Sequence, residues 1–298
     1  MACKRSSVRI RYPPQKTKRF GRNAKPFCSF PYFYTLKLET IAKYRLMKKH
    51  IPNILTLLNL FCGCCAMVCI LNGQYTEGAI FIGVSLIADF LDGYAARCFK
   101  VSSPLGLQLD SLADMVSFGV VPGVIVYNLL CNSFISGGHI EGSTYSLNGN
   151  NEAYLSAFPL NFKALPAFII TLFSCLRLAK FNLDTRQTQS FIGLNTPSNT
   201  TFFIGLMLIV EYNSFGLARF VSNPVFLYSL IPITSYLLVA EIPMFSMKGG
   251  LDKMKITYIV LSTLLLIFFR EVALALNMVI YVLFNIFNYF YHKKLITT

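Results

Sequence analysis

Apolar runs long enough to cross a bilayer recur along the chain from residue 51 onward. A helix needs about 20 predominantly apolar residues to span the hydrocarbon core of a membrane. Windows of this kind predict eight helices, near residues 51–71, 78–97, 105–130, 164–182, 200–217, 224–243, 254–269 and 271–291. Arg270 and Glu271 separate the last two, so we expect a tight hairpin there. The predicted fold class is all-α: a polytopic membrane bundle of about eight helices.

The composition supports a membrane protein. Of the 298 residues, 54% are hydrophobic and 13% are charged, whereas a soluble domain carries roughly 25% charged residues. The net charge of +14 would suit a nucleic-acid partner, but residues 1–46 hold 12 Lys and Arg and one acidic residue. Residues 47–298 hold 15 Lys and Arg against 12 acidic residues. The body of the chain is therefore nearly neutral, and we expect no nucleic-acid partner.

Residues 1–46 form a separate basic segment without apolar periodicity. One interpretation is an arm that is disordered in water or lies on a membrane surface. A second is a non-native upstream start, because Met47 precedes Lys48 and Lys49 and then an apolar run. A third is a targeting peptide of the mitochondrial type, which is Arg-rich and poor in acids. All three place a domain boundary before residue 47, with a transmembrane domain at 47–298.

Basic residues are distributed unevenly between the two ends of the predicted spans. Eight spans place both termini and the links at 98–104 and 183–199 on one side, and the long loop at 132–161 on the other. Beyond residue 46, the first side receives twelve Lys and Arg, and the second receives Lys163, Arg219 and Arg270. The positive-inside rule then predicts both termini in the cytoplasm and a multi-pass protein of the cytoplasmic membrane.

Four aspartates interrupt the second and third predicted spans, at Asp89, Asp92, Asp110 and Asp114. The first pair is three residues apart and the second four, so each pair shares a helix face. A carboxylate in lipid costs roughly 2.5–3.5 kcal/mol, and four like charges repel one another. A divalent cation would offset both effects, and an all-oxygen set favours Mg²⁺ or Mn²⁺. Four acids suffice for two ions, an arrangement typical of phosphoryl transfer.

The residues around these acids leave several interpretations open. Gly93, Ala96 and Gly106 would allow a phosphate or a backbone to approach closely, and Arg97 could hold a phosphate or pair with an acid. Such a structural ion pair, or capping of a helix N-terminus, would account for one aspartate each. A cation or proton pathway in a transporter also uses intramembrane acids. Charge alone therefore leaves catalysis and transport both open.

A cluster of cysteines in the first predicted span offers a different metal site. Its members are Cys62, Cys64, Cys65 and Cys69. A structural metal site needs a complete ligand set, and no His or second Cys pair nearby supplies one. We therefore interpret these cysteines as small residues of a lipid-buried helix.

The spacing of the acidic stretch "DFLDGYAARCFKVSSPLGLQLDSLAD" (89–114) resembles the signature of the CDP-alcohol phosphatidyltransferases. The matching positions are Asp89, Asp92, Gly93, Ala96, Arg97, Gly106, Asp110 and Asp114. Four further segments resemble the phosphatidylserine synthase branch of that family: "KKHIPNILTLLNLFCG" (48–63), "RLAKFN" (177–182), "FIGLNTPSN" (191–199) and "EIPMFSMK" (241–248). Lys180 stands where that branch usually has Arg, and Asn195 where it has Pro.

The resemblance implies a six-helix core with a C-terminal hairpin, a homodimer, and transfer of a phosphatidyl group from CDP-diacylglycerol to L-serine at the cytoplasmic face. It implies that the four aspartates bind two Mg²⁺ or Mn²⁺ ions and that Asp114 is also the catalytic base. It assigns the CDP site to Gly93, Ala96, Arg97 and Gly106. Further candidates for binding the phosphates or the serine carboxylate are Arg177, Lys180, Arg186, Asn53 and Thr56. Glycerol 3-phosphate or inositol stays open as the alcohol, because the acidic signature is shared.

Overall fold

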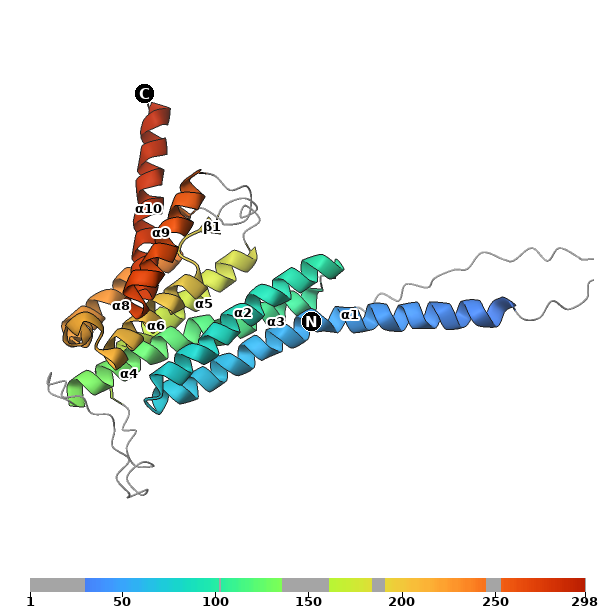
Figure 1. The fold of residues 1–298 in the computed structure, drawn as a ribbon, viewed down its shortest axis with the longest axis horizontal. Coiled ribbons are helices and arrows are strands. Elements are labelled where there is room, and N and C mark those ends of the chain that lie inside the picture. The colour runs from blue at the N-terminus through green and yellow to red at the C-terminus, as the bar shows by residue number, and fades with distance from the viewer. Residues whose placement is uncertain (1–29, 102, 136–160, 184–190, 245–252, 298) are drawn as a thin grey trace, which may run out of the picture. The chain divides into compact units, whose positions relative to one another are not determined.

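The computed structural model describes residues 30–101, 103–135, 161–183, 191–244 and 253–297, which are almost entirely helical (Figure 1). The chain divides into two compact units, Met1–Leu46 and Met47–Thr298, and the packing described below is that of the second unit. The helices are α1 (Phe30–Leu71), α2 (Tyr75–Phe99), α3 (Pro104–Asp114), η1 (Met115–Val120), α4 (Val121–Ile135), η2 (Leu165–Phe168), α5 (Ile169–Leu183), α6 (Thr196–Tyr212), η3 (Ser214–Gly216), α7 (Ala218–Val221), α8 (Pro224–Val239), α9 (Lys253–Phe269) and α10 (Glu271–Thr297).

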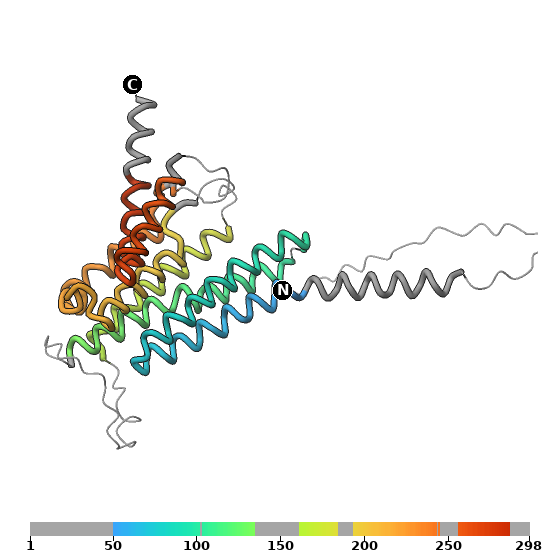
Figure 2. The backbone as a smooth tube through the Cα atoms, viewed as in Figure 1, coloured from blue at the N-terminus to red at the C-terminus, as the bar shows by residue number. Residues whose placement is uncertain are grey.

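Four helical segments are long and apolar enough to cross a membrane: His50–Leu71, Tyr75–Phe99, Pro104–Phe134 and Leu165–Leu183. Shorter apolar helices lie at Pro224–Val239, Ile256–Phe269 and Glu271–Ile286. Figure 2 shows the chain reversing direction between α1 and α2 and again between α2 and α3. These features confirm the predicted all-α polytopic membrane fold.

Helix α6 differs from the predicted span at 200–217, because polar residues fix both of its ends. Asn195 caps its N-terminus: the Asn195 side chain accepts a hydrogen bond from the Ser198 N–H at 3.1 Å. Asn213 ends the helix in the left-handed conformation, with φ of 47°. Asn195, the departure from the family segment, thus serves as a helix cap.

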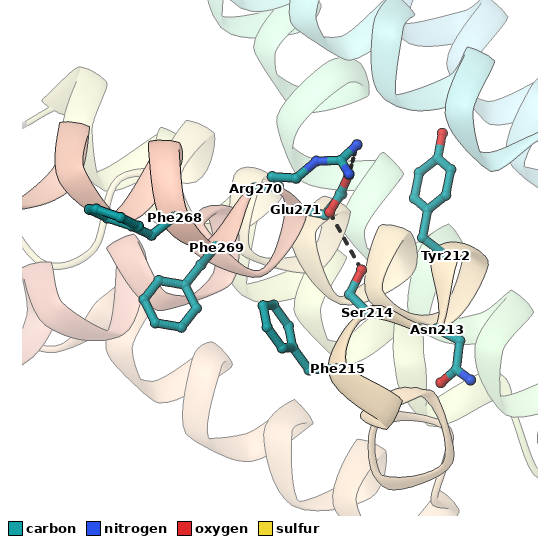
Figure 3. Close-up of a pocket in the computed structure, with 8 residues that line it drawn as sticks. All are labelled: Tyr212, Asn213, Ser214, Phe215, Phe268, Phe269, Arg270 and Glu271. Carbon is teal, nitrogen blue, oxygen red and sulfur yellow. Dashed lines mark hydrogen bonds and ion pairs between the residues drawn. The ribbon is translucent and has the colours of Figure 1, made fainter.

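The predicted hairpin at the C-terminal end is confirmed. Arg270 adopts a positive φ of 46° between α9 and α10, and the two helices pack against each other. Beside this turn lies a pocket of about 380 Å³, which η3 and the end of α6 also line (Figure 3). Arg270 and Glu271 form an ion pair of 3.2 Å there, and the Ser214 hydroxyl donates to Glu271 at 3.4 Å.

The core of the bundle is built around α4 and α6. Residues 121–130 and 202–209 are buried on all sides of their helices, as expected for helices surrounded by protein. Gly205 allows close contact with α10, because a Cβ at this position would lie 2.6 Å from the Ala275 backbone nitrogen. Large apolar side chains are exposed on α1, α2, α5, α8 and α9, where a membrane protein meets lipid.

A short antiparallel ladder fixes the segment that leads into α6. Strands β1 (Phe191–Ile192) and β2 (Pro243–Met244) pair, and the Gly193 N–H donates to the Ile242 carbonyl at 3.0 Å. Gly193 has a φ of 78°, and a Cβ here would lie 2.9 Å from the Leu238 carbonyl oxygen. Only glycine fits these two conditions without strain. The sequence pattern did not predict this pairing.

Candidate functional site

Three of the predicted aspartates converge between α2 and α3. Asp89, Asp92 and Asp110 each place a carboxylate oxygen within 4.8 Å of the others, and we call them the carboxylate triad. The connection between the helices is tight, because Lys100 ends α2 in the left-handed conformation and Ser103 caps α3 by accepting from the Gly106 N–H at 3.0 Å. The short link therefore brings Asp92 and Asp110, which are 18 residues apart, into one site.

The carboxylate triad fits a hard divalent cation. Mg²⁺ binds oxygen at about 2.0–2.1 Å, so two of its ligands lie at most about 4.2 Å apart. The triad oxygens lie within 4.8 Å of one another, so side-chain rotations that move them by a few tenths of an ångström would bring them to the spacing of Mg²⁺ ligands. Among the residues that the structure describes, this triad is the group of His, Cys, Asp or Glu side chains with metal-ligand spacing.

Asp92 is the most buried member of the triad, with 5% of its surface exposed. The hydroxyl of Thr56, on α1, donates a hydrogen bond of 2.6 Å to Asp92 Oδ2. Thr56 is itself 3% exposed, so this bond lies away from water. A partner of this kind orients a metal-binding carboxylate and tunes its affinity. The predicted candidate Thr56 thus contacts the acidic cluster through Asp92.

Asp114, the fourth acid, lies next to the triad and has a separate partner. It interacts electrostatically with Asp89, Asp110 and Asp92. The side-chain amide of Asn59, on α1, donates to Asp114 Oδ1 at 3.2 Å. The Asn59 Oδ1 in turn accepts from the hydroxyl of Ser85, on α2. Asn59 is fully buried and connects three helices at Asp114.

Asn59 is a site residue that our sequence reasoning missed. It follows Asn53 and Thr56 at intervals of three residues, so each of these polar side chains is next to the following one on the surface of α1. An amide residue inside an apolar span, in register with Asn53 and Thr56, was the sequence signal that could have identified it.

A π-helix follows Asp114 directly, where one regular helix was predicted. The residues of η1, Met115–Val120, form this rare conformation, which is frequent at functional sites. The Ser117 hydroxyl donates to the Asn59 carbonyl at 3.0 Å, and the Thr200 hydroxyl donates to the Phe118 carbonyl at 2.9 Å. These bonds connect η1 to α1 and α6, and so fix the backbone next to Asp114.

The small residues of the signature line the same region. A Cβ on Gly106 would lie 3.2 Å from Asn53 Oδ1, so the predicted candidate Asn53 is beside α3. A Cβ on Gly93 would lie 3.4 Å from Arg97 Nη1. Arg97 is exposed and Ala96 is half-buried. These residues allow close contacts beside the triad, next to one exposed guanidinium group.

Arg177, on α5, is a buried cation close to Asp114. It is 8% exposed, donates from Nη1 to the Thr196 hydroxyl at 3.3 Å, and interacts electrostatically with Asp114. Lys180 is exposed on the same helix. Arg186 lies outside the described residues. The structure therefore brings Arg177 within electrostatic range of Asp114 and leaves Lys180 exposed.

The cysteine cluster does not converge on one point. Cys62 is buried, Cys64 is exposed, and Cys65 and Cys69 are half-buried. Among the described residues, the side chains with metal-ligand spacing are three aspartates and include none of these cysteines. Between them, a Cβ on Gly63 would lie 2.9 Å from the Ser117 Cα. This contact supports the interpretation of the segment as small residues that let α1 and η1 approach.

The chain is similar to a known protein family and to several curated relatives. The sequence model of a family described as CDP-alcohol phosphatidyltransferase matches residues 49–283. Three relatives are named CDP-diacylglycerol–serine O-phosphatidyltransferase. The Bacillus subtilis protein is 30% identical over 193 residues, which cover 65% of this chain and 88% of the relative. The Helicobacter pylori protein is 28% identical over 243 residues (80% and 91%), and the Mycobacterium tuberculosis protein is 29% identical over 206 residues (67% and 62%).

Proposed function

The chain belongs to the CDP-alcohol phosphatidyltransferase family, and from this premise we propose that it transfers the phosphatidyl group of CDP-diacylglycerol to L-serine, releasing CMP. The observation that carries the proposal is the convergence of Asp89, Asp92 and Asp110 within 4.8 Å beside Asp114. The choice of serine rests on the names of the relatives and on the segments at 177–182 and 191–199. Because the family is one of phosphotransferases, we set the transport alternative aside.

The carboxylates of the triad and Asp114 hold two divalent cations in this proposal. When bound, two Mg²⁺ or Mn²⁺ ions neutralise the pyrophosphate of the lipid substrate and stabilise the departing CMP. Thr56 keeps Asp92 oriented through its 2.6 Å hydrogen bond. The exposed guanidinium group of Arg97 binds a substrate phosphate, which suits its planar array of donors.

Asp114 acts as the general base. Its carboxylate accepts the proton of the serine hydroxyl as that oxygen attacks the lipid-side phosphorus. The bond from this phosphorus to the bridging oxygen breaks, and CMP leaves with the bonding electrons. The Asn59 amide holds Asp114 in place through the 3.2 Å hydrogen bond. Gly93, Ala96 and Gly106 leave room for the nucleotide.

The substrates set the location of the site in the membrane. One substrate is a lipid and the other is water-soluble, so the acids belong near a membrane surface. The positive-inside pattern favours the cytoplasmic leaflet, with both termini in the cytoplasm. The proposal treats residues 47–298 as the catalytic domain and, by family resemblance, the active form as a homodimer. Size-exclusion chromatography with light scattering tests the dimer.

A panel of alcohols tests the reaction. Purified protein with CDP-diacylglycerol and Mg²⁺ or Mn²⁺ should release CMP when L-serine is added, and phosphatidylserine should accumulate in equal amount. Release with glycerol 3-phosphate or inositol but not with serine would overturn the choice of alcohol. Asp114→Asn should abolish release while the protein remains folded, and retained activity would remove Asp114 from the role of base.

A further inference from the structure

Two buried side chains, Arg177 on α5 and Asn199 on α6, carry polar atoms without partners. Arg177 Nε has no hydrogen-bond partner, and neither amide atom of Asn199 has one. Asn199 is 0% exposed and Arg177 is 8% exposed, so bulk water does not satisfy them. A buried polar group left unpaired costs about 1–3 kcal/mol, so each such group needs an explanation. A polar ligand that enters this region would supply the missing partners.

Neighbouring contacts place Asn199 where α5, α6 and η1 meet. Three residues before it, Thr196 accepts the hydrogen bond from Arg177 on α5. One residue after it, Thr200 donates to the Phe118 carbonyl in η1, the π-helix that starts directly after Asp114. Positions separated by three or four residues share a helix face. Asn199 therefore shares with Thr196 the α6 face that contacts Arg177.

Helix α5 also packs directly against η1. A Cβ on Gly119, in η1, would lie 3.4 Å from the Ser174 Cβ on α5. Ser174 is one helical turn before Arg177, and Gly119 is one turn after Asp114. The unpaired atoms of Arg177 and Asn199 thus lie on α5 and α6, two helices that both contact η1, and η1 begins directly after the proposed base.

The unpaired atoms define the chemistry of the missing ligand. Arg177 Nε and Asn199 Nδ2 are donors, and Asn199 Oδ1 is an acceptor. One buried cation balances one carboxylate, and the acceptor requires an N–H or O–H donor on the same small molecule. A zwitterionic α-amino acid offers both groups. Glycerol 3-phosphate carries a dianionic phosphate and no ammonium group, and inositol carries no charge.

We propose that Asn199 determines the specificity for the alcohol substrate: it accepts a hydrogen bond from the α-ammonium group of serine through Oδ1, while Nδ2 and Arg177 Nε bind the serine carboxylate. This inference rests on the proposed function and extends it to a residue outside the family signature. Asn199 is a binding residue here and takes no part in proton transfer.

Steady-state kinetics with Asn199→Leu test the proposal. The KM for L-serine should rise about 10- to 100-fold, and the KM for CDP-diacylglycerol should stay within about twofold, because the lipid does not contact Asn199 in this arrangement. Leucine is close in size to asparagine and leaves no unpaired polar atoms, so folding should be retained or improved. A substrate analogue separates the two contacts: for 3-hydroxypropionate, which lacks the ammonium group, the loss in kcat/KM should be at least fivefold smaller than for serine.

A second readout does not depend on turnover. L-serine should raise the Tm of the wild-type protein, and this shift should disappear in Asn199→Leu. Ser133→Ala is the matched control, because Ser133 is also buried with an unpaired hydroxyl but lies 19 residues, or about 28 Å of helix, beyond Asp114. It should keep both the serine KM and the Tm shift.

The outcomes separate this inference from the proposed function. If the wild-type protein uses serine and Asn199→Leu keeps a serine KM within twofold of wild type, the inference is wrong and the proposed function stands. If the wild-type protein does not release CMP with serine, the proposed function fails first. An equal loss for serine and 3-hydroxypropionate would remove the ammonium contact and overturn the assignment of Oδ1.

Discussion

Replacing Asn59 by leucine tests whether the proposed base depends on its buried amide partner. The substitution removes the 3.2 Å hydrogen bond to Asp114 while nearly conserving side-chain volume. Ser85 loses its bond to the Asn59 amide but retains a contact of 3.4 Å with the Asn59 backbone carbonyl. We therefore expect the variant to fold, with a stability loss of about 1 kcal/mol.

The expected loss of activity follows from the charge of Asp114. A hydrogen bond to a charged group contributes about 1.5–3 kcal/mol, which corresponds to a factor of roughly 10 to 150 in kcat/KM. Hydrogen bonds between helices in membranes average about 0.6 kcal/mol, which sets a lower bound near threefold. The loss should fall on kcat, because Asn59 holds the base and not the lipid.

Serine-dependent CMP release by the purified variant measures this effect. Thr234→Val is the matched control: it removes a 2.9 Å hydrogen bond from a buried hydroxyl to the Leu230 carbonyl on α8 and leaves the Asn59 amide in place. We expect the kcat of the control to remain within about 1.5-fold of wild type. Should Asn59→Leu behave like the control in kcat, the amide does not position Asp114, and the reasoning that links α1 to the base would be refuted.

Three further predictions concern the metal centre and the fold. EDTA should abolish CMP release, and excess Mg²⁺ or Mn²⁺ should restore it; activity in EDTA would contradict a metal centre. Asp89→Asn should raise the metal concentration needed for half-maximal activity. Thr56→Val should raise that concentration about 10- to 100-fold, because Asp92 loses its 2.6 Å partner, whereas Thr263→Val on the exposed side of α9 should not. Gly193→Ala should lower the free energy of unfolding by about 1–3 kcal/mol, because a Cβ would lie 2.9 Å from a carbonyl oxygen at a φ of 78°. Gly83→Ala is the control and should be neutral or stabilising, because a Cβ there meets open space. Equal stability of the two variants would disprove the strain at Gly193.

The sequence predicted the features that depend on local pattern. Apolar windows located the helices, because lipid requires each spanning segment to satisfy its own backbone hydrogen bonds. The convergence of Asp89, Asp92 and Asp110 was also predictable, because helical spacing and a short link between two spans constrain where the acids can lie. The hairpin turn at Arg270 followed from the length limit of a bilayer.

Features that depend on contacts distant in sequence were not predictable in this way. The π-helix after Asp114 is held by bonds from Ser117 to Asn59 and from Thr200 to Phe118, across separations of 58 and 82 residues. The ladder of β1 and β2 joins segments more than 50 residues apart. Asn59 was only partly predictable. Its spacing from Asn53 and Thr56 was visible in the sequence, but its hydrogen bond to Asp114 became evident only from the structure.

The buried polar residues around Asp114 fall into two groups that differ in pairing. On the side of α1 and α2, Thr56 and Asn59 already have partners in Asp92, Asp114 and Ser85. On the side of α5 and α6, Arg177 Nε and both amide atoms of Asn199 have none. A paired network is rigid before substrate arrives, whereas unpaired buried groups gain most from a ligand that satisfies them. We infer that the paired side holds the metal ions and the nucleotide lipid that the whole family shares, and that the unpaired side selects the alcohol. Substitutions on the first side should therefore impair the reaction with every alcohol, and substitutions on the second should change the preference among alcohols.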